Sequence, residues 1–247
     1  MSTARVALVT GGTRGLGQAV SSRLLSDGVH VAASFREDHA AAEAWCNSLE
    51  RHTNVSLHAG DLGNTDVCRG LVAEIVDRYG RLDYLVNNAG SLTERKLADI
   101  DPLTWELTLG RNLSSAFYLA QAAIPTMAAQ RFGRIVNIGS VSAGMGSQFQ
   151  IDYASAKSGM VGLTRSLARA VARKGITVNC VIPGGFETSI LEEMKLTNRS
   201  AVEKNIPIGR FGRPEELAHV VVSLLHDDAA YVTGSVIVVD GGMSMGT

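Results

Sequence analysis

Tyr153 stands four residues before Lys157 in the segment YASAKSG, with only small residues between them. Positions i and i+4 of a helix lie on one face, so the phenol and the ammonium would share a site. A free phenol has a pKa of about 10, and a nearby cation favours the phenolate and lowers that pKa. The pair therefore predicts a tyrosine tuned for proton transfer. Taken alone, such a pair on a helix is usually a surface contact, so other parts of the chain must support this interpretation.

A glycine-rich turn, TGGTRGLG, follows the first short apolar run of the chain. A strand that turns directly into a helix presents free N–H groups and the positive end of the helix dipole, which bind anions. Gly11 would allow the tight turn, Gly15 would let the backbone approach a pyrophosphate, and Gly17 would let the helix pack closely on the strand. Without further support, the same glycines are compatible with a turn that binds no ligand.

The elements that would position these groups alternate along the chain. Strands are expected at residues 5–10, 29–35, 54–61, 82–88, 133–140, 176–184 and 235–242, and helices at 16–26, 39–51, 66–79, 102–129, 152–174 and 214–226. Alternation of nearly continuous apolar strands with helices predicts a parallel sheet covered on both faces. We therefore expect an α/β fold: one doubly wound Rossmann-type domain over residues 1–247, with about seven strands.

Composition excludes several classes of protein. The 247 residues are 45% hydrophobic and 19% charged, with a formal net charge of -1 and no dense basic run, which argues against a nucleic-acid binder. The widely spaced Cys46, Cys68 and Cys180 are expected to be reduced thiols, and no metal site is expected. With no signal-like segment and no apolar run of about 18 residues, we expect a cytoplasmic protein without membrane contact.

Together these motifs make the chain resemble the short-chain dehydrogenase/reductase family. The glycine turn has the spacing TGxxxGxG of that family's cofactor loop rather than GxGxxG. Further landmarks of the family follow in order over nearly the whole chain: Asp61-Leu62, Asn87–Gly90, Asn112, Ser140, Tyr153, Lys157, Pro183-Gly184 and Thr188. The absence of a GxSxG elbow disfavours a Ser-His-Asp hydrolase, and the absence of GKS or GKT after the glycines argues against a P-loop.

The resemblance implies a nicotinamide-dependent oxidoreductase with Asn112, Ser140, Tyr153 and Lys157 as its catalytic residues. Tyr153 would be the general acid in reduction or the general base in oxidation. Ser140 would hydrogen-bond the substrate oxygen and stabilise charge there. Lys157 would also hold the nicotinamide ribose, and Asn112 would position a water that relays protons to Lys157. The hydride comes from the cofactor.

The same resemblance assigns the cofactor-binding residues. They are Gly11, Thr13, Arg14, Gly15, Leu16 and Gly17 in the glycine turn, followed by Arg36, Asp61, Leu62, Asn88, Ala89, Gly90, Tyr153, Lys157, Pro183, Gly184, Phe186 and Thr188. Asp61 and Leu62 would contact the adenine, and the loop after Pro183 would lie on the nicotinamide side.

The end of the second expected strand bears on which nicotinamide cofactor binds. An NAD site usually has an acidic residue there that bonds the ribose 2′-hydroxyl. This chain has Phe35 at that position and Arg36 next, and Arg14 and Arg36 could bind a 2′-phosphate. Glu37 and Asp38 follow directly, and either could reach the ribose if the loop bends. We expect NADP(H).

Within the family, the segments IPIGRFGRPEELA and YVTGSVIVVDGGMSMG are most similar to β-ketoacyl-acyl-carrier-protein reductases. Reduction of a 3-oxoacyl thioester is therefore expected, with Ser140, Gln148, Phe149 and Tyr153 contacting the substrate. Gln148 and Phe149 depart from the small glycines that are common at these positions. A dehydrogenase or reductase of another alcohol or ketone (sugar, steroid or xenobiotic carbonyl) and a non-catalytic NADP-binding sensor are the alternatives.

Partners are also implied by the resemblance. An acyl carrier protein would dock near Arg131 and Lys174, although basic residues at helix ends favour the helix dipole in any case. Residues Glu192 to Lys204 would form a helical lid over the substrate. A homotetramer is expected, with the long helices around Asn112 and Tyr153 each pairing with a symmetry mate; burial of these helices within one subunit is the alternative.

Overall fold

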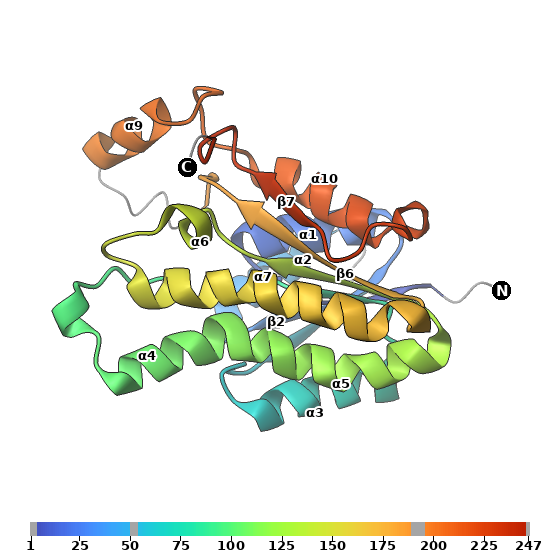
Figure 1. Ribbon diagram of the computed structural model, residues 1–247. Coiled ribbons are helices and arrows are strands. Elements are labelled where there is room, and N and C mark those ends of the chain that lie inside the picture. The colour runs from blue at the N-terminus through green and yellow to red at the C-terminus, as the bar shows by residue number, and fades with distance from the viewer. Residues whose placement is uncertain (1–3, 50–53, 189–195, 246–247) are drawn as a thin grey trace.

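The computed structural model describes residues 4–49, 54–188 and 196–245, and it contains a seven-stranded sheet (Figure 1). The strands are β1 Val6–Val9, β2 His30–Phe35, β3 Val55–Ala59, β4 Tyr84–Asn87, β5 Gly133–Ile138, β6 Ile176–Pro183 and β7 Val236–Val239. They lie in the order β3-β2-β1-β4-β5-β6-β7, and every neighbouring pair is parallel. The predicted α/β Rossmann-type fold is confirmed.

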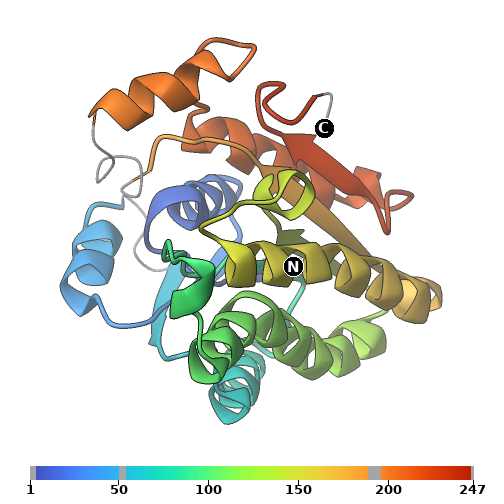
Figure 2. The same ribbon diagram turned by 60° about the vertical axis from the view of Figure 1, so that its left-hand side comes forward.

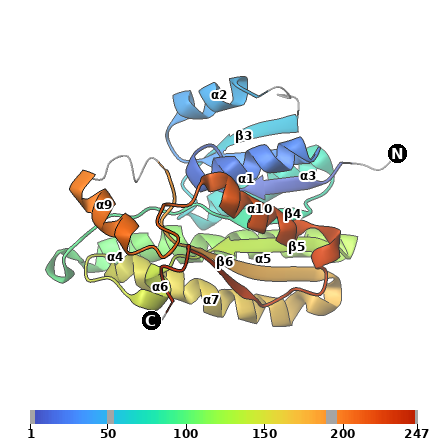
Figure 3. The same cartoon turned by 90° about the horizontal axis from the view of Figure 1, so that it is seen from above.

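Helices cover both faces of the sheet, as Figure 3 shows from above. One face carries α1 Gly15–Ser26, α2 His39–Asn47 and α10 Pro214–Leu225, and the other carries α3 Thr65–Tyr79, α5 Ser115–Gln130 and α7 Ile151–Val171. Successive residues of a strand point to opposite faces. Accordingly, Ala7 and Val9 of β1 belong to the core under α1 and α10, whereas Val6 and Leu8 belong to the core under α3 and α5.

Several short elements depart from the predicted pattern. The helix expected over 102–129 is α4 Pro102–Leu109 and α5, joined by a π-helical turn at Gly110–Ser114. The short helix α6 Ser142–Met145 and the 3-10 turn Leu97–Asp99 lie in segments where neither a helix nor a strand is predicted. Of the expected lid, α9 Leu196–Lys204 is a helix, and residues 192–195 lie outside the described residues.

The order of the strands places a crevice at their carboxyl ends. The chain runs outward from β1 to β3 and then returns to β4 on the other side of β1. In open α/β sheets such a reversal is where ligands bind. Helices α6 and α9 lie at this end of the molecule, at the left of Figure 1, and Figure 2 turns that side toward the viewer.

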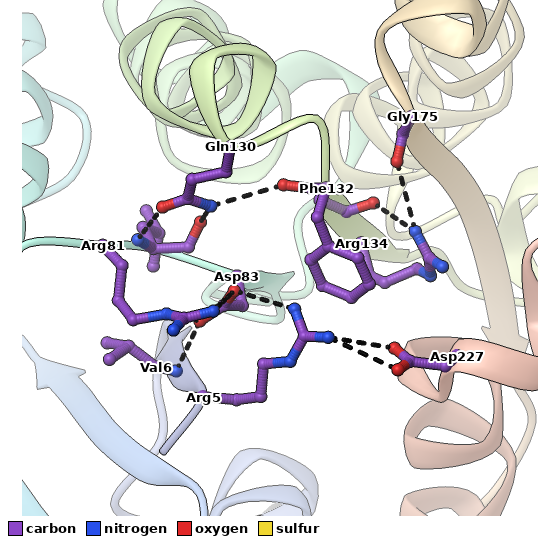
Figure 4. Close-up of polar contacts among 11 residues, drawn as sticks. Arg5, Val6, Arg81, Asp83, Gln130, Phe132, Arg134, Gly175 and Asp227 are labelled. Atoms are coloured by element: carbon purple, nitrogen blue, oxygen red, sulfur yellow. Dashed lines mark hydrogen bonds and ion pairs between the residues drawn. The ribbon is translucent and has the colours of Figure 1, made fainter. Parts of the chain in front are cut away.

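The opposite end of the sheet is held by a buried carboxylate, that of Asp83 (Figure 4). It accepts hydrogen bonds from Arg5 Nη1 at 3.1 Å, from Arg81 Nε at 2.8 Å and from the Val6 N–H at 2.8 Å. Arg5 also pairs with Asp227 at 3.3 Å. Because a buried carboxylate needs partners, this cluster ties the starts of β1 and β4 together and fixes the strands that carry the crevice at their other end.

Within the described ranges, no helix is long and apolar enough to cross a membrane. Nor do three or more His, Cys, Asp or Glu side chains among these residues gather where they could hold a metal ion.

Candidate active site

A cleft of about 420 Å³ opens at the carboxyl ends of the strands. It is lined by the glycine turn, by the ends of β2, β3 and β4, and by the first turns of α7. Most residues expected around a dinucleotide line it: Gly11, Thr13, Arg14, Gly15, Leu16, Arg36, Asp61, Leu62, Asn88, Ala89, Gly90, Tyr153, Lys157, Pro183 and Thr188. Segments far apart in sequence therefore meet around one cleft.

The glycine turn forms an anion-binding end of this cleft. Helix α1 begins at Gly15, whose φ of +52° lies in the left-handed region that favours glycine. Arg14 is the N-cap, and its side chain makes no capping hydrogen bond to the described residues. Gly15 and Leu16 line the cleft, and their N–H groups have no side-chain partner among the described residues, which leaves them open to an anion such as a pyrophosphate. These features fit a dinucleotide cofactor.

The turn is fastened to the end of β4 through Thr10. Its hydroxyl donates to the Val86 carbonyl at 3.2 Å and accepts from the N–H groups of Asn88 and Ala89, each at 2.9 Å. The Asn88 side chain returns a bond from Nδ2 to the Thr10 carbonyl at 2.9 Å. These bonds hold the NNAG segment, residues 87–90, against the glycine turn, so the two sides of the cleft that they form are fixed relative to each other.

Tyr153 and Lys157 share one face of α7, as their spacing predicts. Lys157 is buried, and its Nζ donates to the Ile138 carbonyl at the end of β5, at 2.9 Å. The same Nζ lies 5.6 Å from the centre of the Tyr153 ring. Ser140 lies near enough to the Tyr153 phenol to lower its pKa, and its own Oγ lies 2.8 Å from Ser142 Oγ. Tyr153 and Lys157 therefore line one wall of the cleft, and the Ser140 hydroxyl lies beside the phenol.

Burial changes the acidity of both groups on α7. It raises the pKa of Tyr153 above its ordinary value, an effect that the nearby Ser140 hydroxyl opposes. It lowers the pKa of Lys157 to about 8. The direction for Tyr153 is opposite to the predicted lowering, because the loss of hydration on burial is the largest influence on the phenol. At pH 7 both groups keep their protons.

Asn112 lies in the π-helical turn and is fully buried. Its Nδ2 donates to the carbonyls of Ser91 and Thr108, both at 3.0 Å, and its Oδ1 accepts from the Ser91 N–H at 3.2 Å. A Cβ built on Gly90 would lie 2.5 Å from Asn112 Oδ1 and 3.5 Å from Lys157 Nζ. Asn112 and Lys157 are therefore brought together across a glycine. The proton relay assigned to Asn112 stays a prediction.

One residue beside the site was not identified from the sequence. Asp152 is fully buried, and its Oδ2 accepts from Thr108 Oγ1 at 2.7 Å and from Arg95 Nη1 at 3.3 Å. Its Oδ1 accepts from the Tyr153 N–H at 2.9 Å. An acidic residue in the first turn of a helix is the one signal that the sequence offered. The carboxylate links α4, α7 and the loop after β4.

The far end of the cleft carries several charges. Phe35 ends β2, and Arg14 and Arg36 line the cleft together with Glu37. Arg36 Nε pairs with Glu37 Oε1 at 2.7 Å, so this carboxylate is engaged by the arginine. Arg111, also missed from the sequence, lies here and donates from Nη2 to Asp61 Oδ2 at 2.6 Å.

Other predicted residues lie away from the described lining. Gly17 packs under the turn, where a Cβ would collide with the Gly11 carbonyl oxygen. A Cβ on Gly184 would lie 2.6 Å from the Asp240 Cβ, and Phe186 packs against Gly212 in the interior. Gln148 and Phe149 are exposed and, in the part of the chain that the structure describes, do not line the cleft. Their contact with substrate stays a prediction.

Arg131 and Lys174 lie at the other end of the sheet from the cleft. Both are exposed, and they precede β5 and β6, which are neighbours. A Cβ on Gly175 would collide with the Arg131 carbonyl oxygen, so the two connections touch. The predicted docking residues are thus adjacent to one another but remote from the cleft of the same chain.

Comparison with known proteins agrees with this geometry. The family model described as enoyl-(acyl carrier protein) reductase matches residues 11–244. Nodulation protein G of Azospirillum brasilense is 37% identical over 241 residues, which cover 97% of this chain and 98% of that protein. The 3-oxoacyl-(acyl-carrier-protein) reductase FabG of Vibrio harveyi is 36% identical over 241 residues, 98% of each chain. Acetoacetyl-CoA reductase of Rhizobium meliloti (strain 1021) is 38% identical over 240 residues, covering 96% of this chain and 98% of that protein.

Proposed function

Because the chain belongs to the short-chain dehydrogenase/reductase family, we propose that it uses NADPH to reduce a 3-oxoacyl thioester on acyl carrier protein to the 3-hydroxyacyl product. The family makes the protein an oxidoreductase that acts on CH–OH groups with a nicotinamide cofactor. The observation that carries the proposal is that Tyr153, Ser140 and Lys157 lie together beside a cleft of about 420 Å³, which the glycine turn also lines.

The proposed chemistry divides between the cofactor and the chain. When bound, the reduced nicotinamide supplies a hydride to the carbonyl carbon. Tyr153 donates its proton to the carbonyl oxygen as general acid. Ser140 donates a hydrogen bond to the same oxygen and stabilises the negative charge that develops there. Lys157 places a positive charge beside the phenolate that remains on Tyr153, which favours proton transfer.

The acidity of the site supports the reductive direction. Burial raises the pKa of Tyr153, so the phenol holds its proton at pH 7 and is ready to donate it. Lys157, with its pKa lowered to about 8, is still mostly a cation at that pH. Oxidation would need the opposite protonation state of Tyr153 at the start of the reaction.

The preference for NADPH rests on the residues after β2. Phe35 offers no carboxylate to the ribose 2′-hydroxyl, and Glu37 is held by Arg36 at 2.7 Å. Arg14 and Arg36 both line this part of the cleft, and guanidinium groups suit a 2′-phosphate. We expect the kcat/KM for NADPH to exceed that for NADH at least about tenfold.

The thioester substrate is inferred from the relatives. A 3-oxoacyl-(acyl-carrier-protein) reductase and an acetoacetyl-CoA reductase each match nearly the whole chain. Both names denote reduction of the 3-oxo group of an acyl thioester. We propose the same substrate class here, with Ser140, Tyr153, Gln148 and Phe149 around the acyl group.

The test is NADPH consumption at pH 7 with an acetoacetyl thioester, run beside NADH and beside Tyr153→Phe. Fast turnover that is specific for NADPH and lost in Tyr153→Phe is the expected result. Binding of NADPH without thioester turnover would remove the substrate assignment. A panel of sugar, steroid and xenobiotic carbonyls would then separate another reductase from a non-catalytic cofactor sensor.

A further inference from the structure

The hydroxyl of Ser142 contacts the hydroxyl of Ser140, the residue that would hydrogen-bond the carbonyl oxygen of the substrate. Ser142 is the first residue of α6, and it is buried. Its Oγ lies 2.8 Å from Ser140 Oγ, and either atom could be the donor. Its N–H donates to the same Ser140 Oγ at 3.3 Å. Ser142 therefore reaches the Ser140 hydroxyl through both its backbone and its side chain.

The backbone on both sides of Ser140 is fixed by the sheet. The N–H of Gly139 donates to the Val181 carbonyl at 2.8 Å, and the N–H of Val141 donates to the Pro183 carbonyl at 3.1 Å. These two bonds extend the pairing of β5 with β6 past Ser140. The sheet thus sets where the residue lies. The direction of its hydroxyl proton is set separately, because that proton rotates to suit its partners.

The hydrogen-bonding capacity of a hydroxyl indicates which of the two serines donates. Each hydroxyl has one proton and two acceptor positions. Ser140 Oγ already accepts from the Ser142 N–H, and its second acceptor position suits the Ser142 proton. If Ser140 donated to Ser142 instead, the buried Ser142 proton would have no partner among the residues that the structure describes. Because a buried donor without a partner is costly, donation from Ser142 to Ser140 is favoured.

The acidity of Tyr153 agrees with this direction. Burial raises the pKa of the phenol, and the Ser140 hydroxyl acts against that rise. A hydroxyl lowers the pKa of a phenol by donating to the ionised oxygen. The Ser140 proton is therefore available on the side of Tyr153, where the carbonyl oxygen of the substrate would lie, and is not committed to Ser142.

We propose that Ser142 is a positioning residue for Ser140: its hydroxyl donates to Ser140 Oγ and thereby turns the Ser140 proton toward the carbonyl oxygen of the substrate. This inference rests on the carbonyl reduction of the proposed function. Both acceptor positions of Ser140 are then filled, so its proton has one direction left. In a chain of hydrogen bonds each bond polarises the next. Ser140 therefore also becomes a better donor to the negative charge that develops on the carbonyl oxygen.

A purely structural role of Ser142 would be the support of α6, and a matched control tests that role. Helix α6 packs beside α7 (Figure 1), and the Ser158 hydroxyl of α7 donates to the Ala143 carbonyl of α6 at 2.8 Å. Ser158 is exposed. Ser158→Ala removes a hydroxyl from the support of α6 without touching Ser140, so it should leave kcat within about twofold of the wild-type value.

The test is a double-mutant cycle on the kcat of NADPH-dependent reduction of an acetoacetyl thioester. We expect Ser142→Ala to lower kcat about tenfold and to change the KM for the thioester less than about twofold, because the lost bond acts mainly in the transition state. Ser140→Ala should lower kcat about a hundredfold or more. When Ser140 is already alanine, Ser142→Ala should have no further effect, since it acts only through the Ser140 hydroxyl.

A pair of substitutions of similar size isolates the hydroxyl from the packing of α6. Ser142→Thr keeps the hydroxyl, whereas Ser142→Val puts a methyl group in its place. Any crowding by the added methyl group is shared by both variants, so the ratio of their kcat values reports the hydroxyl. We expect Ser142→Thr to exceed Ser142→Val about fivefold or more in kcat.

Three results would overturn the proposal: a loss from Ser142→Ala that is as large without the Ser140 hydroxyl as with it, equal kcat in Ser142→Thr and Ser142→Val, or a loss in Ser158→Ala that equals the loss in Ser142→Ala. A wild-type protein that reduces another carbonyl but no thioester would contradict only the substrate of the proposed function, and the same cycle would be measured on that carbonyl. A wild-type protein that reduces no carbonyl would overturn both the proposed function and this inference.

Discussion

At the scale of single residues, burial sets the chemistry of Tyr153 and Lys157. The phenol and the ammonium both lose hydration on α7, and each is pushed toward its neutral form: the pKa of Tyr153 rises and that of Lys157 falls to about 8. The neutral phenol is the form that donates a proton, whereas Lys157 assists only as a cation. The pH range of reduction should therefore be limited by Lys157.

We predict that kcat/KM for reduction is constant below about pH 7 and falls as the pH rises through about 8, where Lys157 loses its proton. The measurement is the pH profile of NADPH-dependent reduction. Lys157→Arg is the control, because a guanidinium stays charged and should remove the fall at alkaline pH from whatever activity is left. A wild-type profile that stays flat to about pH 10 would contradict this assignment.

The sequence predicted where Tyr153 and Lys157 lie but not how they titrate. Their spacing on one helix is a local property, so the shared face could be inferred from five residues. Their burial depends on the end of β5 and on Ser140, which the local pattern does not contain. Arg111 and Asp152 were missed for the same reason, since Asp61 lies 50 residues from Arg111 and Thr108 lies 44 residues from Asp152.

At the scale of secondary-structure elements, the strands and long helices were predicted well because their signals are local. Apolar runs mark β1, β5 and β6, and glycine turns mark the starts and ends of helices. The π-helical turn at Gly110–Ser114 was not predicted, because GRNLS continues the helical pattern of its neighbours. That turn places Arg111 beside Asp61 and Asn112 beside Ser91.

Asp152 is the link between the elements around Tyr153. It joins the start of α7 to Thr108 on α4 and to Arg95 in the loop after β4. We predict that Asp152→Ala lowers the free energy of unfolding by about 3 kcal/mol, since it leaves buried donors and a cation without their acceptor. It should also lower kcat about tenfold or more by displacing Tyr153. Chemical denaturation and steady-state kinetics measure the two effects.

Asp152→Asn is the matched variant for this prediction. Its amide oxygen can still accept from Thr108 or from the Tyr153 N–H, so more than half of both effects should be recovered. Thr108→Val removes a single donor and should give a smaller loss of stability. If the Ala and Asn variants behaved alike and kept wild-type kcat, Asp152 would have no positioning role.

At the scale of the whole molecule, large apolar side chains remain exposed on the helices that precede α7. Leu103, Trp105 and Leu107 of α4 and Phe117 of α5 are 64%, 36%, 47% and 40% exposed. Proteins rarely leave this many large apolar side chains open to water, so a partner surface is expected to cover these four. We therefore keep the homotetramer implied by the family resemblance as a proposal, in which these helices would meet their symmetry mates.

The positions of Arg131 and Lys174 connect the proposed homotetramer to the proposed docking of an acyl carrier protein. They lie together at the amino ends of β5 and β6, whereas the cleft lies at the carboxyl ends of the strands. An acyl carrier protein docked on them would therefore deliver its substrate to the cleft of a neighbouring copy. Delivery of the substrate in this way would need both the acyl carrier protein and the homotetramer.

We predict that Arg131→Glu and Lys174→Glu each raise the KM for an acyl-carrier thioester about tenfold and leave the KM for the matching CoA thioester unchanged, because rim charges steer an acidic partner without touching the acyl group. Arg69→Glu, which makes the same change of charge on an exposed position of α3, should alter neither value. The effect should shrink at high salt, since exposed charges are screened. Equal losses with both thioesters would place the two residues in the support of the fold rather than in docking.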